Sequence, residues 1–156
     1  MWSRRIILGS ALAFAGCGFT PVLGTDGAMR ALQNATEIEA PDSIVGFRIK
    51  DALVRRLGVA TEPAFALAVT YSQSVDAAAV STGGDTTRLS IIGESNWKLR
   101  RGGEVIAQGD VSSFTGYDAT GSTVATQTAA EDARERLAVA LADLILAEIA
   151  LTLSAP

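Results

Sequence analysis

The sequence predicts an α+β fold in which two helices pack on one face of a mostly antiparallel four-stranded sheet. Apolar and polar residues alternate over residues 65–75, 89–100 and 104–115, as strands with one buried face require. Two other segments, residues 42–57 and the stretch after Thr128, carry apolar residues at helical spacing. The resulting order of strand, helix, three strands and helix places both helices on one side of the sheet.

The first two elements lie between Ala35 and Gly58. Residues 35–40 alternate weakly around Ile38 and stop at Pro41, which predicts a short first strand. Asp42 or Ser43 can cap the helix that follows, and Gly58 can end it. The apolar face predicted for this helix consists of Ile44, Phe47, Val54 and Leu57, with Leu53 at its margin.

The next three strands form a predicted antiparallel meander. Phe65 to Val75 has its large apolar residues at odd positions, and so has the strand from Leu89 to Leu99. Trp97 shares the parity of Leu99, which assigns it to the core. Arg101-Gly102-Gly103 predicts a tight hairpin turn, because glycine accepts the positive φ that such turns need. The returning strand, from Glu104 to about Thr115, places Val105, Ala107 and Val111 on one side.

A long helix closes the chain after a polar stretch from Gly116 to Gln127. Thr128 and Glu131 form a candidate capping box at its start. Its predicted apolar stripe consists of Leu137, Leu141, Leu144, Ile145 and Leu151. The loops Ala77 to Asp85 and Gly116 to Thr126 are either partner contacts or plain connections.

The first 17 residues have the layout of an exported lipoprotein. Arg4 and Arg5 precede an uncharged, mostly apolar run of residues 6–16, and small Ala15 and Gly16 stand before Cys17. Spanning a bilayer takes about 20 apolar residues, so this run predicts a removable signal peptide. Cys17 is the only cysteine, and lipidation of its thiol explains a lone cysteine in an exported chain. The alternative is that Cys17 is an ordinary buried thiol.

The predicted organisation is a signal peptide over residues 1–16, a lipidated tether over 17–34 and one α+β domain over 35–156. Several acyl chains on Cys17 hold a protein on a membrane stably, because each buried methylene contributes about 0.8 kcal/mol. Removing the signal leaves 11 basic and 17 acidic residues, a net charge of about −6. An acidic chain of this kind is not expected to bind nucleic acid.

Missing residue types restrict the chemistry. The chain has no histidine, and its one cysteine is assigned to lipid. Histidine-based triads, cysteine nucleophiles and Cys/His zinc sites are therefore excluded. Glu94 and Asp110, the acids within the predicted strands, have no spacing that indicates a catalytic pair. We expect no enzyme activity, no metal site and no cofactor apart from the covalent lipid on Cys17.

The start of the predicted mature chain resembles a known family. Cys17-Gly18-Phe19, followed by Pro21 and Gly24, is similar to the Cys-Gly-Phe-x-Pro-x-Tyr-Gly start of alphaproteobacterial lipopolysaccharide-assembly lipoproteins, the LptE family. Leu23 stands where that pattern has an aromatic residue. The element order and the strand around Ser95-Asn96-Trp97 also resemble the family.

The resemblance implies a lipoprotein of the outer membrane, facing the periplasm or the lumen of a β-barrel. Its partners would be the barrel LptD, which it plugs and helps to assemble, and lipopolysaccharide on its way to the cell surface. Anionic lipid A would favour a basic surface. The candidate lipopolysaccharide-binding residues are Arg88, Lys98 and Arg100 on one strand face and Arg101 at its turn. The alternative is that these charges only keep an exposed strand face soluble.

Two other functions remain open at this stage. The chain has the properties of a lipoprotein accessory subunit of an ABC-type lipid or solute transport system, and a ligand cavity would favour that function. It also has the properties of a structural outer-membrane lipoprotein that contacts neither barrel nor lipid.

Overall fold

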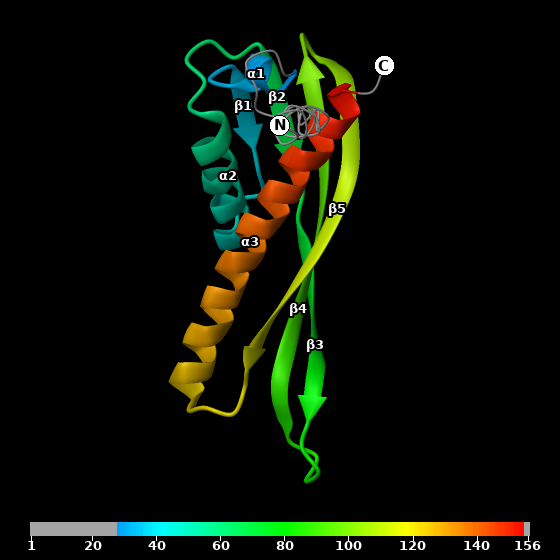
Figure 1. Cartoon of the computed structure of the whole chain (residues 1–156). Coiled ribbons are helices and arrows are strands. Elements are labelled where there is room, and N and C mark those ends of the chain that lie inside the picture. The colour runs from blue at the N-terminus through cyan, green and yellow to red at the C-terminus, as the bar shows by residue number, and fades with distance from the viewer. Residues whose placement is uncertain (1–27, 155–156) are drawn as a thin grey trace, which may run out of the picture.

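The computed structural model describes residues 28–154, which form a five-stranded mixed sheet and three helices (Figure 1). The predicted α+β class is confirmed. The prediction of four strands and two helices was wrong, because one predicted strand is two and a short helix precedes the first strand. The signal peptide and Cys17 lie outside the described residues.

Strand β4 (Thr86–Arg101) is the centre of the sheet. From Arg88 to Arg101 it pairs antiparallel with β5 (Glu104–Asp118) on one edge. On the other edge, β2 (Phe65–Val69) pairs with its last residues and β3 (Ser72–Val80) with its first part. β1 (Thr36–Glu39) adds to β2 in parallel, so the sheet is not wholly antiparallel. The predicted glycine hairpin between β4 and β5 is confirmed, with φ of 58° at Gly102 and 89° at Gly103.

The predicted strand from Phe65 to Val75 is interrupted at Thr70 and Tyr71. The Thr70 amide donates to the carbonyl of Asn96 at 2.8 Å, and the buried Ser95 hydroxyl donates to the carbonyl of Thr70 at 2.7 Å. These bonds keep the segment on β4 while the regular ladder breaks, which separates β2 from β3. β3 then continues to Val80, into the stretch that the sequence assigned to a loop from Ala77 to Asp85.

Helix α2 (Ile44–Leu57) begins where the sequence predicted, but it buries a different face. Ser43 is the N-cap, and its hydroxyl accepts from the Gly46 amide at 3.0 Å. Ile44 and Phe47, predicted to be buried, are 77% and 70% exposed. The buried residues are Val45, Gly46, Ile49, Ala52, Leu53 and Leu57. Small Gly46 and Ala52 let the backbone approach its neighbours, and such residues add little to an apolar pattern.

Helix α3 (Thr123–Ser154) begins before the predicted capping box. Ser122 precedes it and accepts the Ala125 amide at 3.3 Å, whereas Thr128 lies inside the helix and donates to the carbonyl of Val124. In the predicted stripe, Leu137, Leu141 and Ile145 are buried, but Leu144 and Leu151 are 41% and 72% exposed. By length and composition α3 is the one helix in residues 28–154 able to cross a membrane. Nine of its side chains are buried, so here it is the core helix of the domain.

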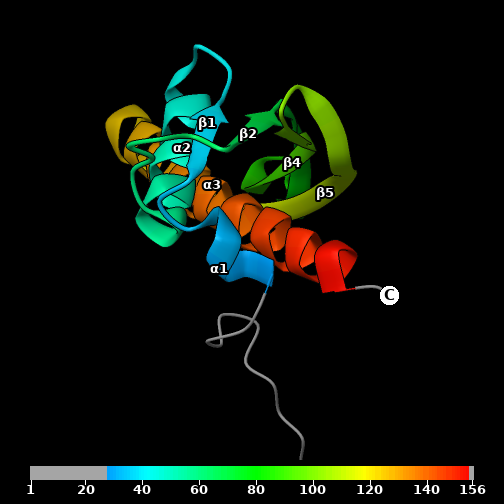
Figure 2. The ribbon, with the colours of Figure 1, turned by 90° about the horizontal axis from the view of Figure 1, so that it is seen from above.

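Helix α1 (Ala28–Leu32) lies in the segment that the sequence assigned to the tether. Met29 and Leu32 are buried in the core, and the Thr36 hydroxyl donates to the carbonyl of Leu32 at 2.8 Å. The folded part therefore includes residues before Ala35. Seen from above, α1 lies beside the C-terminal end of α3, and the helices cover one face of the sheet (Figure 2).

Candidate functional site

The face of the sheet that turns away from the helices is the first candidate surface. Alternation along β4 puts Arg88, Glu94, Asn96, Lys98 and Arg100 on this open face. β5 adds Phe114, which is 76% exposed and pairs with Ile92. Small Ala66 and Ala68 of β2 pair with Arg100 and Lys98. No helix between Ala28 and Ser154 covers these side chains, so a partner can reach them.

Of the four predicted basic residues, the structure brings only Lys98 and Arg100 together. They are two positions apart on the open face, about 7 Å along the strand. Arg88 is ten positions from Lys98, about 33 Å along the strand, and its guanidinium lies 3.8 Å from the carboxylate of Asp118. Arg101 has the opposite parity, and its guanidinium carbon lies 5.4 Å from the centroid of the Phe65 ring. The candidate basic site therefore contracts to Lys98 and Arg100.

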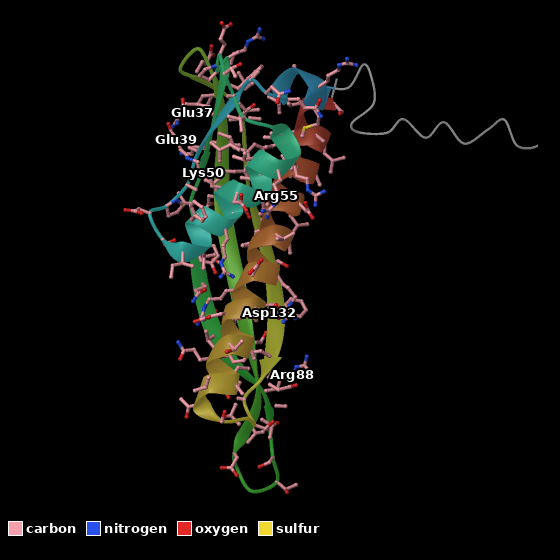
Figure 3. The ribbon with its side chains drawn as sticks, turned by 90° about the vertical axis from the view of Figure 1, so that its left-hand side faces the viewer. Glu37, Glu39, Lys50, Arg55, Arg88 and Asp132 are labelled. Atoms are coloured by element: carbon pink, nitrogen blue, oxygen red, sulfur yellow. The ribbon has the colours of Figure 1, made fainter. Side chains whose placement is uncertain are left out.

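Acidic residues of β1 flank this basic pair. Glu37 is in register with Ala66 and Glu39 with Ala68, so each acid lies two strands from a basic residue on the same face. Figure 3 shows Glu37 and Glu39 near Lys50 of α2, with Arg88 far away toward the other end of the molecule. The upper part of the open face is thus an acidic row and a basic row separated by alanines.

Trp97 lies in the core, as predicted. It is 1% exposed, and its indole Nε1 donates to Glu148 Oε2 of α3 at 2.7 Å. Trp97 fixes α3 to the sheet beneath the basic pair and does not reach the open face.

A second candidate surface is a cleft of about 710 Å³ between α2, α3 and the start of β3. Sequence reasoning missed it, because its walls come from three separate segments. Apolar side chains and two arginines share the lining. The residues are Pro41, Ser43, Ile44, Val45, Arg48, Tyr71, Ser72, Gln73, Glu131 and Arg134.

Charges in the cleft are only partly compensated. Arg48 pairs with Glu135 at 3.0 Å and also donates to the carbonyl of Glu131. Arg134 has no hydrogen-bond or ion-pair partner within residues 28–154. Burial raises the pKa of the Tyr71 phenol above its ordinary value of 10.0, and the positive charge of Arg134 lowers it by a smaller amount. A neutral phenol, a guanidinium and the exposed Ile44 together suit a ligand with an anionic group and an apolar part.

No cluster of three metal-ligating side chains occurs between Ala28 and Ser154. Glu94 and Asp110 are both exposed, and they are not direct partners across the β4–β5 ladder.

The two predicted loops are shorter in the structure than the sequence suggested. The first consists of residues 81–85 and the second of residues 119–122.

Comparisons with solved structures show that other bacterial proteins share this fold. No protein-family model matches the chain, and no curated protein sequence matches it. Among solved structures, a proposed lipoprotein from Caulobacter crescentus is 20% identical and aligns over 82% of this chain and 97% of its own, with a TM-score of 0.65. Rare lipoprotein B from Shewanella oneidensis is 14% identical and aligns over 76% of this chain and 95% of its own, with a TM-score of 0.60. A minor lipoprotein from Acinetobacter baumannii is 16% identical and aligns over 79% of this chain and 97% of its own, with a TM-score of 0.57. The chain therefore has a fold also found in these bacterial lipoproteins.

Proposed function

We propose that the chain is an outer-membrane lipoprotein of the LptE type, anchored by lipid on Cys17. In this proposal it occupies the lumen of the LptD β-barrel, helps the barrel to assemble and assists lipopolysaccharide insertion. The role is structural and does not require catalysis. One observation carries the proposal: a start that resembles the family, Cys17-Gly18-Phe19-x-Pro21, precedes a domain whose fold recurs in bacterial lipoproteins.

The shape and surface of the domain fit a plug. Its long strands and α3 run along one elongated body (Figure 1). The open face of the sheet and the outer surface of α2 carry charged side chains, which suit a wet barrel lumen, together with the exposed Phe114, Ile44 and Phe47. The core is continuous across the sheet and all three helices, so a rigid body can be inserted as a unit.

Lys98 and Arg100 are the proposed contact for anionic lipopolysaccharide. The test compares binding of purified lipopolysaccharide to the wild-type domain and to a Lys98→Glu, Arg100→Glu double variant. Charge-assisted contacts contribute about 1.5–3 kcal/mol each, so affinity is expected to fall at least tenfold. Arg88→Glu is the matched control, because Arg88 is on the same strand face at the far end. Equal losses in both variants would contradict a localised contact.

The barrel partnership is tested by copurification. The full-length precursor, tagged at its C-terminus, is expressed in an alphaproteobacterial host and extracted from membranes with mild detergent. The proposal predicts a one-to-one complex with an outer-membrane β-barrel and a mature N-terminus that begins at lipidated Cys17. Recovery with an inner-membrane transporter, or with no partner, would reject the barrel assignment.

The cleft favours a second candidate function, a lipoprotein accessory of an ABC-type lipid or solute transport system. Its volume of about 710 Å³ lies in the range of small-molecule sites, and it combines apolar walls with a few polar groups. Arg134→Ala would weaken ligand binding in that case. Lipopolysaccharide binding that depends on Arg134 and not on Lys98 and Arg100 would shift the proposed site from the open face to the cleft.

A further inference from the structure

The outward face of the C-terminal half of α3 carries an apolar stripe that no other helix or strand within residues 28–154 covers. The stripe consists of Ala140, Leu144, Ala147 and Leu151, at spacings of four, three and four residues. This spacing aligns side chains along one side of a helix. Leu151 is 72% exposed and Leu144 41% exposed, while Ile145 and Ile149 on the opposite side are fully buried.

No free charge interrupts this surface. Between Leu137 and Ser154 the helix has only two ionisable side chains, Asp143 and Glu148. Asp143 pairs with Arg56 of α2 at 2.8 Å, and Glu148 accepts the indole N–H of Trp97. Glu148 therefore points to the sheet, while Asp143 and Arg56 form a half-exposed ion pair at the margin of the stripe. The contrast with the first half of α3 is clear, because Glu131, Asp132, Glu135 and Arg136 are exposed there.

The stripe lies at the end of the molecule where the N-terminal segment joins the domain. α1 packs beside the C-terminal end of α3, and its buried Met29 and Leu32 fix that position (Figure 2). Ten residues, 18–27, separate Cys17 from α1, and an extended chain from Cys17 to Ala28 spans at most about 40 Å. The stripe is about 17 Å long. A lipid on Cys17 would therefore hold the membrane surface within reach of the stripe.

We propose that this stripe lies against the lipid surface before the domain enters the barrel, and that it fixes how the domain is oriented on the membrane. The proposal rests on the lipid anchor of the proposed function. Helices that lie in the membrane interface place an apolar face about 5–10 Å into the boundary between headgroups and acyl chains. Two leucines and two alanines bind weakly alone, but a short tether supplies an effective concentration in the millimolar range. Anchor and stripe together hold the domain more firmly than the anchor alone.

A second copy of the chain fits the stripe less well. Stable protein interfaces bury about 800 Å² on each partner, which needs 20–30 residues. The stripe offers four, and the charged first half of α3 lies directly beyond it. A lipid surface requires no matching shape and is already held close by the anchor.

The test uses the mature chain, residues 17–156, coupled through the thiol of Cys17 to a maleimide phospholipid in phosphatidylcholine vesicles. Chemical coupling makes the result independent of whether the cell lipidates Cys17, so failure here is distinct from failure of the proposed function. Ala147→Trp places a fluorescent reporter in the stripe. Val124→Trp is the control, because Val124 is 75% exposed at the opposite end of α3.

Brominated phosphatidylcholine, which quenches tryptophan on contact, reports insertion. The fluorescence of the Ala147→Trp reporter is expected to fall by about half, because an interfacial helix face reaches the acyl boundary. Fluorescence of the Val124→Trp control should not change, because position 124 lies at the far end of α3 from the stripe. The native Trp97 is buried, so it adds the same unquenched background to both variants. Adding Leu144→Ser and Leu151→Ser should abolish quenching at position 147, with circular dichroism confirming the fold. Equal quenching at positions 147 and 124, persistent quenching in the serine variant, or dimerisation without quenching would overturn the proposal. If Ala147→Trp does not fold, Leu151→Trp serves as the reporter, and Leu144→Ser alone is then the disrupting change.

Discussion

Trp97 of β4 and Glu148 of α3 form the hydrogen bond that joins the longest helix to the centre of the sheet. The indole Nε1 and Glu148 Oε2 are 2.7 Å apart, and Trp97 is almost completely buried. Gly109 of β5 lies opposite Trp97 in the ladder, and its missing side chain leaves room for the carboxylate. Three elements therefore meet at one partly buried polar contact at the edge of the apolar core.

Removing the acceptor should destabilise the domain. Glu148→Ala leaves the indole N–H of Trp97 without its partner, which costs about 1–3 kcal/mol of unfolding free energy. Glu148→Gln keeps an acceptor oxygen and should lose less than Glu148→Ala. Urea unfolding followed by circular dichroism measures both. Glu131→Ala, on the exposed surface of the same helix, should change stability by less than about 0.5 kcal/mol. A Glu148→Ala variant as stable as that control would show that the hydrogen bond contributes nothing.

Gly109 should tolerate a side chain only when Glu148 is shortened. A Cβ at position 109 would lie 2.7 Å from Glu148 Oε1, closer than real Cβ contacts allow. Moving the flexible Glu148 carboxylate away from this Cβ disrupts its hydrogen bond to Trp97, so Gly109→Ala should destabilise the wild-type domain by about 1–3 kcal/mol. The same change in a Glu148→Ala background should cost clearly less. A double-mutant cycle of unfolding free energies measures the difference, and additive effects would contradict the contact.

Two isoleucines of α2 test the observed orientation of that helix. Ile49 is fully buried and Ile44 is 77% exposed, although the sequence pattern placed Ile44 in the core. Ile49→Val should cost about 0.5–1.5 kcal/mol of unfolding free energy, and Ile44→Val should cost less than about 0.5 kcal/mol. The two substitutions remove the same methylene, so the difference reports burial alone. A larger loss at Ile44 would mean that the helix is rotated.

The phenol of Tyr71 should make stability fall at high pH. Burial raises its pKa in the folded domain above the ordinary value of 10.0. The stabilising contribution is therefore fully present below about pH 10 and is lost as pH rises through the folded-state pKa. Ultraviolet titration of the wild-type domain minus the Tyr71→Phe variant isolates this group. Arg134→Gln should raise the pKa further, because it removes the charge that favours phenolate. A lower pKa in that variant would contradict the proximity of the two side chains.

Patterns of period two and the glycine turn predicted most of the sheet core, but not the start of β5. Val105, predicted to share a side with Ala107, pairs with Arg100 after a register shift and is 44% exposed. Trp97, Leu99 and the hairpin at Gly102 and Gly103 occur as predicted, because alternation directly reports which strand face is buried. The break at Thr70 was not predictable. It depends on hydrogen bonds to Ser95 and Asn96, residues that are remote in sequence. The parallel addition of β1 likewise depends on tertiary pairing and not on its four residues.

Helix faces were predicted less well than strand faces. Ile44, Phe47, Leu144 and Leu151 fit an apolar periodicity, yet all four are exposed. Small residues decide which side packs: Gly46 and Ala52 in α2, and Ala138, Ala142 and Ala150 in α3, are buried. Alanine and glycine add little to a hydrophobic pattern but let a helix pack closely against its neighbours. The apolar pattern therefore did not reveal which helix face is buried. The start of α3 was missed for a related reason, since its first turns are exposed and need no apolar spacing.

The candidate basic site was half predictable. Strand parity correctly placed Lys98 and Arg100 on one face. Strand parity gives the face on which a residue lies but not its distance along the strand. The prediction therefore grouped Arg88 with Lys98, which is about 33 Å away along β4. The cleft around Tyr71 and Arg134 could not be found from sequence, because α2, β3 and α3 meet there only in the folded domain.

Photo-crosslinking from two opposite sides of the domain tests most directly whether it sits inside a barrel. Phe114 on the open sheet face and Phe47 on α2 are 76% and 70% exposed. Each is replaced by p-benzoylphenylalanine in cells, with buried Leu141 as the control position. A plug is surrounded by its partner, so both exposed positions should crosslink to the same outer-membrane β-barrel protein and Leu141 should not. A barrel adduct from only one of the two positions would mean that the domain docks beside the barrel, and no adduct from either would contradict the proposed partnership.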